Sequence, residues 1–326
     1  MPEPLTGSLF EIDGFGTLTC ECGIFPVIDG IPILDRRHNE QRLVALLKQG
    51  AFSTAASECL MVDIWRAPRL LRLLWRLLRK FDVPNGLYER IKMCLTFREA
   101  LPIGVPASAY HEYLRCRFSD PTFVAGEWLL ANTQPTSGWV LDVPAGAGHF
   151  SWVLRQRHPH ARILTADASF FFMMMVKRFL VPSATAICLD ANAPLPFKAD
   201  QFELAVSADG WHYLDAQALF LHELTRVKRP EANLVMLHVH NRAVSNYTPG
   251  RPFALDEIMR LLRQIHGGPA VALNERAVAA RAWSQPSDWP FVHVADPHSQ
   301  EFDLWIGELP REIHRANAGS SSRKNA

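Results

Sequence analysis

The spacing of hydrophobic positions divides the chain into three regions. Residues 1–36 hold short apolar runs between glycine turns, which predicts a small β module. Its expected strands are 9–12, 17–20 and 25–28. In residues 37–132 apolar side chains recur every three or four positions, which predicts a helical cap or lid. Its expected helices are 39–49, 63–81, 87–99 and 107–118, with breaks at Pro84, Pro102, Pro106 and Pro121.

The third region, residues 133–316, alternates strand-like and helical segments. Its expected strands are 140–143, 163–166, 186–189, 204–207 and 234–239. Because this alternation is typical of a parallel sheet covered by helices on both faces, we predict a Rossmann-like, doubly wound α/β domain. Residues 317–326 contain no apolar anchor and are expected to form a disordered tail.

The composition indicates which binding partners and which cellular compartment to expect. The 34 basic and 33 acidic side chains give a formal net charge of +1, so nucleic acid is not the expected partner. The apolar stretches are shorter than the roughly 18 residues of a membrane span, so no transmembrane helix is expected. The six cysteines follow no signal segment, which favours reduced thiols and a cytoplasmic location.

A nucleotide-type ligand site is predicted where the first strand of the third region ends. That strand delivers Asp142 into a small-residue turn with Gly146 and Gly148, and the turn opens a helix. The next strand ends on Asp167, where an acid can reach ribose hydroxyls. A pyrophosphate site needs glycine at the position of Pro144. S-adenosylmethionine (SAM) carries an ammonium and a sulfonium group instead, and Asp142 suits both.

Residues 138–240 resemble the class I SAM-dependent methyltransferases. The acid and glycine turn of that family correspond to Asp142, Gly146 and Gly148, with Pro144 at the usual first glycine. The ribose acid corresponds to Asp167, and the adenine-flanking step to Asp190-Ala191. The resemblance therefore implies SAM as the cofactor. It implies these cofactor-binding residues: Asp142, Pro144, Ala145, Gly146, Gly148, Asp167, Ala168, Asp190, Ala191 and Ser207.

Each acid also has a structural interpretation. Asp142 could cap the turn or helix that follows it, and Asp167 could cap the helix begun by Ser169. Asp190 could form an Asx-turn before Pro194.

Methyl transfer to a hydroxyl needs a base near the methyl group, and His212 is the catalytic candidate. It follows a strand at the carboxyl edge of the sheet, where open α/β folds bind ligands. The alternative is a packed structural histidine. The expected substrate pocket adds Asp209, Trp211, Tyr213, Tyr110 and His240. His238 and His240 lie two residues apart and share a face, so one of them could line this pocket.

A second resemblance covers residues 18–34, which are similar to the second half of the zinc-ribbon-like module of tRNA methyltransferase activator proteins. Zinc needs four ligands, and this segment supplies only Cys20 and Cys22, so no metal is expected. We interpret the module as a docking element that buries its apolar residues against the lid. Those residues are Phe25, Val27, Ile28, Ile31 and Ile33.

Residues 66–80 hold six basic side chains and no acid opposite a leucine stripe, which predicts an amphipathic helix. Its basic face is either simply solvated or attracts an anionic substrate, an acidic carrier protein or a membrane surface.

These features together predict a SAM-dependent methyltransferase with a helical lid. The expected reaction is O-methylation of a small or carrier-linked metabolite, as in secondary-metabolite or sugar tailoring. One alternative is an rRNA or tRNA methyltransferase. Another is a SAM-binding protein that does not methylate, such as a cyclase or an adaptor. The pattern leaves the oligomeric state open.

Overall fold

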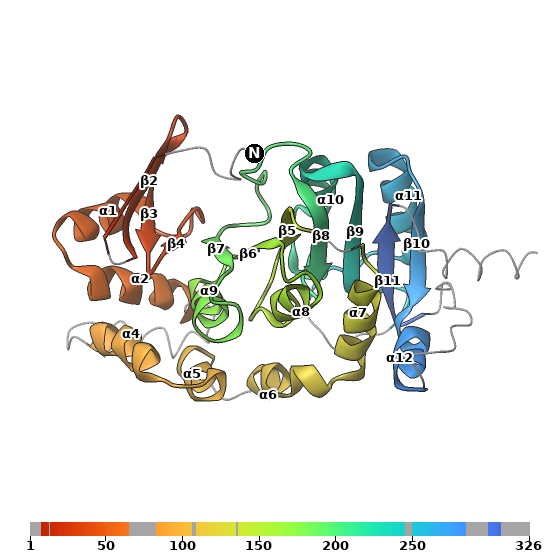
Figure 1. Cartoon of the computed structure of the whole chain (residues 1–326), viewed down its shortest axis with the longest axis horizontal. Helices are drawn as coiled ribbons and strands as arrows, with labels where there is room; N and C mark the ends of the chain where they lie inside the picture. The colour runs from red at the N-terminus through yellow and green to blue at the C-terminus, as the bar shows by residue number, and fades with distance from the viewer. Residues whose placement is uncertain are drawn as a thin grey trace, which may run out of the picture. The chain divides into compact units, whose positions relative to one another are not determined.

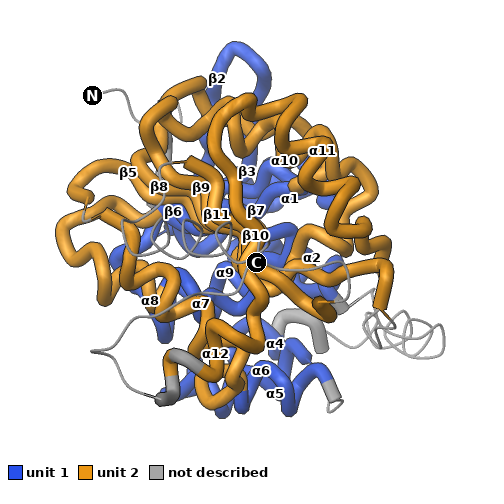
Figure 2. The backbone as a smooth tube through the Cα atoms, turned by 90° about the vertical axis from the view of Figure 1, so that its right-hand side faces the viewer, with its two compact units in different colours: residues 1–116, 146–151, 164–190 blue, residues 117–145, 152–163, 191–326 orange. Residues whose placement is uncertain are grey.

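The computed structural model describes residues 8–12, 14–64, 83–105, 109–134, 136–244, 250–284 and 299–307. They form two compact units, each discontinuous in sequence (Figure 2). Unit 1 contains residues 1–116, 146–151 and 164–190, and unit 2 contains 117–145, 152–163 and 191–326. The predicted basic helix 66–80 and the predicted tail 317–326 lie outside the described residues. The predicted domain boundaries at residues 36 and 132 stay a prediction.

In unit 1, four antiparallel strands form the small sheet at the N-terminal end of the chain (Figure 1). They are β1 (Ser8–Ile12), β2 (Phe15–Cys20), β3 (Gly23–Ile28) and β4 (Ile31–Pro32). The residues Val27, Ile28, Ile31 and Ile33 are buried. Phe15 stacks on Phe52 at a centroid distance of 4.8 Å and meets Tyr88 edge-on at 6.3 Å. The apolar face of the module therefore packs on the helices that follow it.

The helices of unit 1 differ from the predicted ones at three places. The described helices of unit 1 are α1 (Glu40–Lys48), α2 (Phe52–Ile64), α4 (Val83–Met93), α5 (Phe97–Gly104), α6 (Ala109–Cys116) and α9 (Phe170–Met175). The single predicted helix 87–99 is wrong, because Thr96 starts a new helix by accepting the Glu99 N–H at 3.2 Å. The predicted break at Pro102 is also wrong, since α5 continues through it. The α2 helix was not predicted, because its first turns contain little but small residues.

The large sheet has seven strands in the order β10-β11-β9-β8-β5-β6-β7 (Figure 1). Their bounds are β5 (Trp139–Asp142), β6 (Arg162–Asp167), β7 (Thr185–Cys188), β8 (Phe202–Ala208), β9 (Lys228–His240), β10 (Ala270–Asn274) and β11 (Glu301–Ile306). The pairs β5–β8, β8–β9 and β6–β7 are parallel, whereas β11 runs antiparallel to both of its neighbours. This architecture confirms the predicted Rossmann-like α/β fold. The sequence pattern did not predict the antiparallel strand β11.

Helices cover both sides of the strands in unit 2. The helices α10 (Gln217–Val227) and α11 (Leu255–Ile265) lie on one side, and α7 (Pro121–Ala131) and α12 (Glu275–Ser284) on the other (Figures 1 and 2). The remaining helix, α8 (His149–Arg157), follows the turn after β5. All four residues of β5 are buried, as expected for a strand with covered faces. Among the described residues, no helix has the length and apolar character needed to cross a membrane.

The cysteines correct one expectation. Cys20 ends β2, and Cys22 lies in the turn before β3, which brings their Cα atoms within 5.3 Å of each other. The two form a disulfide, so the expectation of reduced thiols is wrong for this pair. Cys59, Cys94, Cys116 and Cys188 are free thiols.

Candidate functional site

The glycine turn after β5 is held by a carboxylate in unit 1. The Gly146 N–H donates to Oδ2 of Asp167 at 2.9 Å, and the Ser169 N–H donates to Oδ1 at 2.9 Å. One side chain thus fixes both the turn before α8 and the loop after β6. Ser169, not Asp167, is the N-cap of α9, because its Oγ accepts the Phe172 N–H at 3.2 Å.

The two glycines of this turn have different surroundings. Both have a left-handed backbone, with φ of +52° at Gly146 and +86° at Gly148. A Cβ at Gly148 would lie 2.3 Å from Cγ2 of Val176, so the turn packs tightly there. A Cβ at Gly146 would have no described atom within 4 Å. The backbone at Gly146 is therefore open to a ligand.

In unit 2, the residues before this turn lie beside the loop after β8. Asp142 is completely buried at the end of β5. Pro144 follows a cis peptide bond and packs on Gly210, where a Cβ would lie 2.2 Å from Cγ of Pro144. Ser207 is buried in β8, and its hydroxyl has no hydrogen-bond partner among the described residues. The carboxyl ends of β5 and β8 thus lie side by side.

The other expected cofactor residues have varied surroundings. The carbonyl oxygen of Ala168 accepts from the Arg37 guanidinium and from the Cys188 thiol. Ala145 and Asp190 are half-buried, and Ala191 is buried. After Ala191, the Asn192 side chain accepts the N–H groups of Asp215 and Ala216. Asn192 therefore connects this loop to the start of α10.

His212 is a buried, neutral imidazole in unit 2. It lies in a short 3₁₀ segment, Trp211–Tyr213, and is 3% exposed. Its ring centroid is 4.0 Å from that of Tyr213 and 4.1 Å from that of His240. Neither ring nitrogen has a hydrogen-bond partner among the described residues. Burial, with the charge of His240, lowers the pKa of His212 to about 4, although Asp209 partly offsets this.

Two histidines of β9 surround the carboxylate of Asp209. Oδ1 of Asp209 lies 3.4 Å from Nε2 of His240 and 3.9 Å from Nε2 of His238. Nδ1 of His238 lies 2.8 Å from Oε2 of Glu275. Burial disfavours the charged form of His238, but Glu275 and Asp209 outweigh it and raise the pKa to about 9. The structure thus brings together Asp209, His212 and His240, three of the predicted residues.

Sequence reasoning missed two acids in this cluster. Glu275 is 1% exposed at the start of α12, and Asp303 is 0% exposed in β11. Burial, with the nearby Glu275, raises the pKa of Asp303 well above its usual range. An acid between Phe302 and Leu304 in an apolar strand was a usable signal for Asp303. No comparable pattern pointed to Glu275.

The three aromatic candidates differ in burial. Trp211 is buried, packs edge-on against Phe253 and donates its Nε1–H to the Gln217 carbonyl at 3.2 Å. These contacts give it a structural role. Tyr213 is 51% exposed, and Tyr110 in unit 1 is 47% exposed and stacks on Tyr113.

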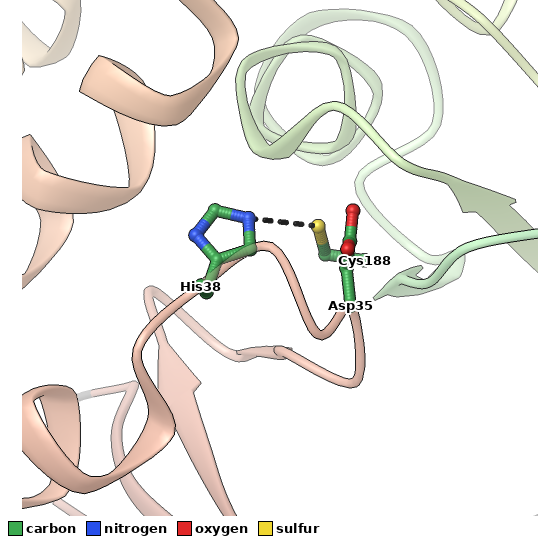
Figure 3. Close-up of side chains that lie close together, drawn as sticks. All are labelled: Asp35, His38 and Cys188. Carbon is green, nitrogen blue, oxygen red and sulfur yellow. Dashed lines mark hydrogen bonds between the residues drawn. The ribbon is translucent and has the colours of Figure 1, made fainter.

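A second cluster, in unit 1, contains Asp35, His38 and Cys188 (Figure 3). Nε2 of His38 lies 3.8 Å from Sγ of Cys188. Asp35 and the Cys188 thiol also form hydrogen bonds with groups outside the cluster. Asp35 accepts the N–H and Nε–H of Arg37, and the Cys188 thiol donates to the Ala168 carbonyl. Burial raises the pKa of Cys188 well above its usual range, so it stays a thiol. We interpret this cluster as packing between the segment after β4 and β7, which also pair at Ile33 and Cys188.

The comparisons with known proteins concern this part of the chain. Residues 141–236 match the family described as a methyltransferase domain. A malonyl-[acyl-carrier protein] O-methyltransferase of Methylococcus capsulatus is 30% identical over an alignment of 169 residues that covers 47% of this chain and 61% of the relative. The chain thus spans about three fifths of that relative. The family match supports the predicted methyltransferase domain over residues 141–236.

Solved structures of similar shape include two SAM-dependent methyltransferases. The one from Thermotoga maritima has a TM-score of 0.44 and 15% identity, covering 60% of this chain and 94% of the other. The one from Aquifex aeolicus has a TM-score of 0.38 and 15% identity, covering 58% and 94%. At these scores neither bears on the function of this chain.

Proposed function

We propose that the protein is a SAM-dependent methyltransferase that methylates an oxygen of a small or carrier-linked metabolite. The observation that carries this proposal is the hydrogen bond from Gly146 to Asp167 within the methyltransferase domain. It joins an open glycine turn to a carboxylate at the carboxyl edge of a parallel sheet, where such folds bind nucleosides.

The chain's own residues fit SAM at three points. Asp142 is a buried carboxylate at the end of β5, suited to the ammonium of the methionyl part. Asp167 offers its carboxylate to the ribose hydroxyls, and the Asp190-Ala191 step would lie along the adenine. Gly146 presents backbone where a side chain would obstruct the cofactor.

SAM supplies an electrophilic methyl group when bound. The protein then has to hold the acceptor oxygen in line with that methyl group, because positioning supplies much of the rate in such displacements. His212 is neutral at pH 7 and can accept the acceptor's proton at either ring nitrogen. Asp209 and His240 would orient the acceptor beside it.

Two observations support a carrier-linked acid or a related oxygen acceptor as the substrate. The curated relative is named for O-methylation of a malonyl group on an acyl-carrier protein. The formal net charge of +1 gives no general attraction to a nucleic acid. Methylation of an oxygen is also the reaction expected in secondary-metabolite tailoring.

The N-terminal module is proposed to be a docking element derived from an activator-type zinc ribbon. Its support is the packing of Phe15 on Phe52 and the ammonium of Lys177, which donates to the Gly30 carbonyl at 2.9 Å. With Cys20 and Cys22 joined in a disulfide, that pair offers no thiolate to a zinc ion.

Purified protein incubated with methyl-labelled SAM tests the proposal. The acceptors are malonyl-acyl-carrier protein, malonyl-coenzyme A, hydroxylated small molecules and transfer RNA. We expect label on an oxygen of a non-nucleic-acid acceptor. Label on RNA would favour the RNA methyltransferase alternative. Binding of SAM without transfer to any acceptor would favour a non-methylating protein.

Replacing His212 tests the catalytic role. With a hydroxyl acceptor, His212→Asn should lower kcat about 100- to 10,000-fold, the usual contribution of a general base, and leave SAM affinity unchanged. A carboxylate acceptor carries no proton to remove, so methylation of such an acceptor should be affected much less. His222→Asn is the matched control, since His222 is 62% exposed in α10. An equal effect of both substitutions, or none from His212→Asn, would remove His212 from the mechanism.

A further inference from the structure

We infer that Asp209, His238 and His240 form a binding site for a divalent first-row transition-metal ion, with zinc as the first candidate. All three belong to unit 2, where Asp209 follows β8 and the histidines end β9. One ligand atom from each lies within 4.8 Å of the others. Two imidazoles and one carboxylate are donors that such ions prefer.

The distances around the carboxylate suit a shared ion. Oδ1 of Asp209 is 3.4 Å from Nε2 of His240 and 3.9 Å from Nε2 of His238. Ligand atoms at about 2.1 Å from a tetrahedral ion lie about 3.4 Å from one another. The Asp209–His240 distance of 3.4 Å matches this value, and the Asp209–His238 distance of 3.9 Å exceeds it by about 0.5 Å.

An outer layer of hydrogen bonds fixes His238 in the orientation that a metal ligand requires. Its Nδ1 pairs with Oε2 of Glu275 at 2.8 Å, which leaves Nε2 directed at Asp209. Its backbone N–H donates to Oδ1 of Asp303 at 2.9 Å. A carboxylate on the far nitrogen of a histidine is the usual support of a bound metal, because it fixes the tautomer and increases ligand basicity.

The backbone at two of the three residues is strained. Asp209 has φ of +50° and His238 of +54°, a conformation that costs a non-glycine residue free energy. The β9–β11 pairing shifts its register at this point, between Phe302 and Leu304. The Asp209 N–H donates to the Leu237 carbonyl at 3.0 Å. Both strained residues turn their side chains toward the same place, and an ion there would explain why the strain is kept.

Three protein ligands leave a coordination position open, which is typical of catalytic rather than structural zinc sites. The ring centroid of His212 lies 4.1 Å from that of His240, so His212 borders the proposed site. An acceptor oxygen bound to the ion would lose its proton more readily. This use of the site depends on the proposed methyl transfer, whereas the binding of the ion does not.

Metal binding can be measured on the full-length protein without any activity. The protein is treated with a chelator, dialysed and titrated with Co²⁺, and the visible absorption of the bound ion is followed. Zn²⁺ is then added as a competitor, and the bound metal is counted by elemental analysis. We expect about one ion per chain, with Zn²⁺ displacing Co²⁺.

Variants assign the site. His240→Ala and Asp209→Asn should each weaken Co²⁺ binding at least about 100-fold, and Glu275→Gln about 10- to 100-fold through His238. The matched control is His266→Ala, at the end of α11 in the same unit, which should bind Co²⁺ as the wild type does. Circular dichroism confirms that each variant is folded.

Absence of stoichiometric Co²⁺ binding by the wild-type protein would overturn the proposal, as would binding that both His240→Ala and Asp209→Asn leave intact. Methyl transfer that persists in the metal-free protein would overturn only the catalytic use of the ion. Metal binding without methyl transfer would leave the site standing and count against the proposed function.

Discussion

Asp167 orders the backbone at the site proposed for the cofactor. Its two carboxylate oxygens accept the N–H groups of Gly146 and Ser169. Hydrogen bonds to a charged acceptor are about twice as strong as neutral ones. In the proposed function, the same carboxylate would also contact the ribose.

Asp167→Asn should weaken SAM binding about 10- to 100-fold, because a hydrogen bond to a charged group contributes about 1.5–3 kcal/mol. Isothermal titration calorimetry measures the change. Asp256→Asn, on the exposed face of α11, is the control and should bind SAM normally. Equal affinity in the two variants would exclude Asp167 from the cofactor site.

Because His38 is buried, we expect the free energy of unfolding to fall at acidic pH. Burial lowers its pKa to about 4, opposed by Asp35 and assisted by Arg37. Between pH 6.5 and 4 the unfolded imidazole binds a proton that the folded one does not, so the free energy of unfolding falls as the pH drops through this window. The loss should reach up to about 3 kcal/mol.

Urea unfolding of His38→Gln and of the wild type at pH 7 and pH 4.5 checks this prediction. The variant should lose less stability than the wild type between the two pH values. His160→Gln, outside the cluster, is the control. A variant with the wild-type pH dependence would show that His38 is not the group responsible.

At the scale of single residues, the sequence predicted the members of the Asp209 cluster that follow strands. It missed the members that other elements bring to the same cluster. Asp209, His212 and His240 lie near the ends of β8 and β9, so the rule that ligands bind at the carboxyl edge found them. Glu275 and Asp303 reach the same cluster from α12 and β11. Their approach depends on the place of β11 in the sheet, which no local pattern specifies.

The turn between β5 and α8 is the element on which the proposed cofactor binding depends most directly. Its two glycines share a backbone conformation but not an environment, since Gly148 packs on Val176 and Gly146 faces open space. The two positions can therefore separate the stability of the fold from the binding of the ligand.

Gly148→Ala should destabilise the protein by several kcal/mol, because its Cβ would overlap Val176 and the backbone is left-handed. Gly146→Ala should cost only about 1–2 kcal/mol, since only the backbone term applies, yet it should abolish detectable SAM binding. Chemical denaturation and calorimetry measure the two effects. Normal SAM binding by Gly146→Ala would place the cofactor elsewhere.

Element boundaries followed the sequence where caps and turns were strong. The predicted strand 25–28 ends where the Asp29-Gly30 turn begins, and φ is +54° and +67° at these two residues. The predicted helix 87–99 failed because Thr96 is a cap inside a run with continuous helical periodicity. Periodicity alone cannot detect such a cap when the apolar stripe resumes in phase beyond it.

At the scale of the whole molecule, a ligand that binds the folded chain but not the unfolded chain stabilises the fold, so SAM should stabilise this protein. At a free concentration 100 times the dissociation constant, the gain is about 2.7 kcal/mol. For a chain of this size that gain corresponds to a rise in Tm of roughly 5 °C.

Thermal unfolding followed by intrinsic fluorescence, with and without SAM, tests this stabilisation. The Gly146→Ala variant should show no rise in Tm, and the Asp256→Asn variant should show the full rise. A wild-type Tm that SAM leaves unchanged would contradict cofactor binding by the folded protein.

The antiparallel strand β11 has a consequence for biosynthesis. It lies between β9 and β10 in the sheet, yet it follows both in the chain. Until β11 emerges from the ribosome, β10 lacks the strand with which it pairs in the described sheet, and the edge of β9 that β11 covers is bare. Completion of this half of the sheet therefore has to wait until β11 leaves the exit tunnel, and a nascent chain stalled before that point should engage chaperones.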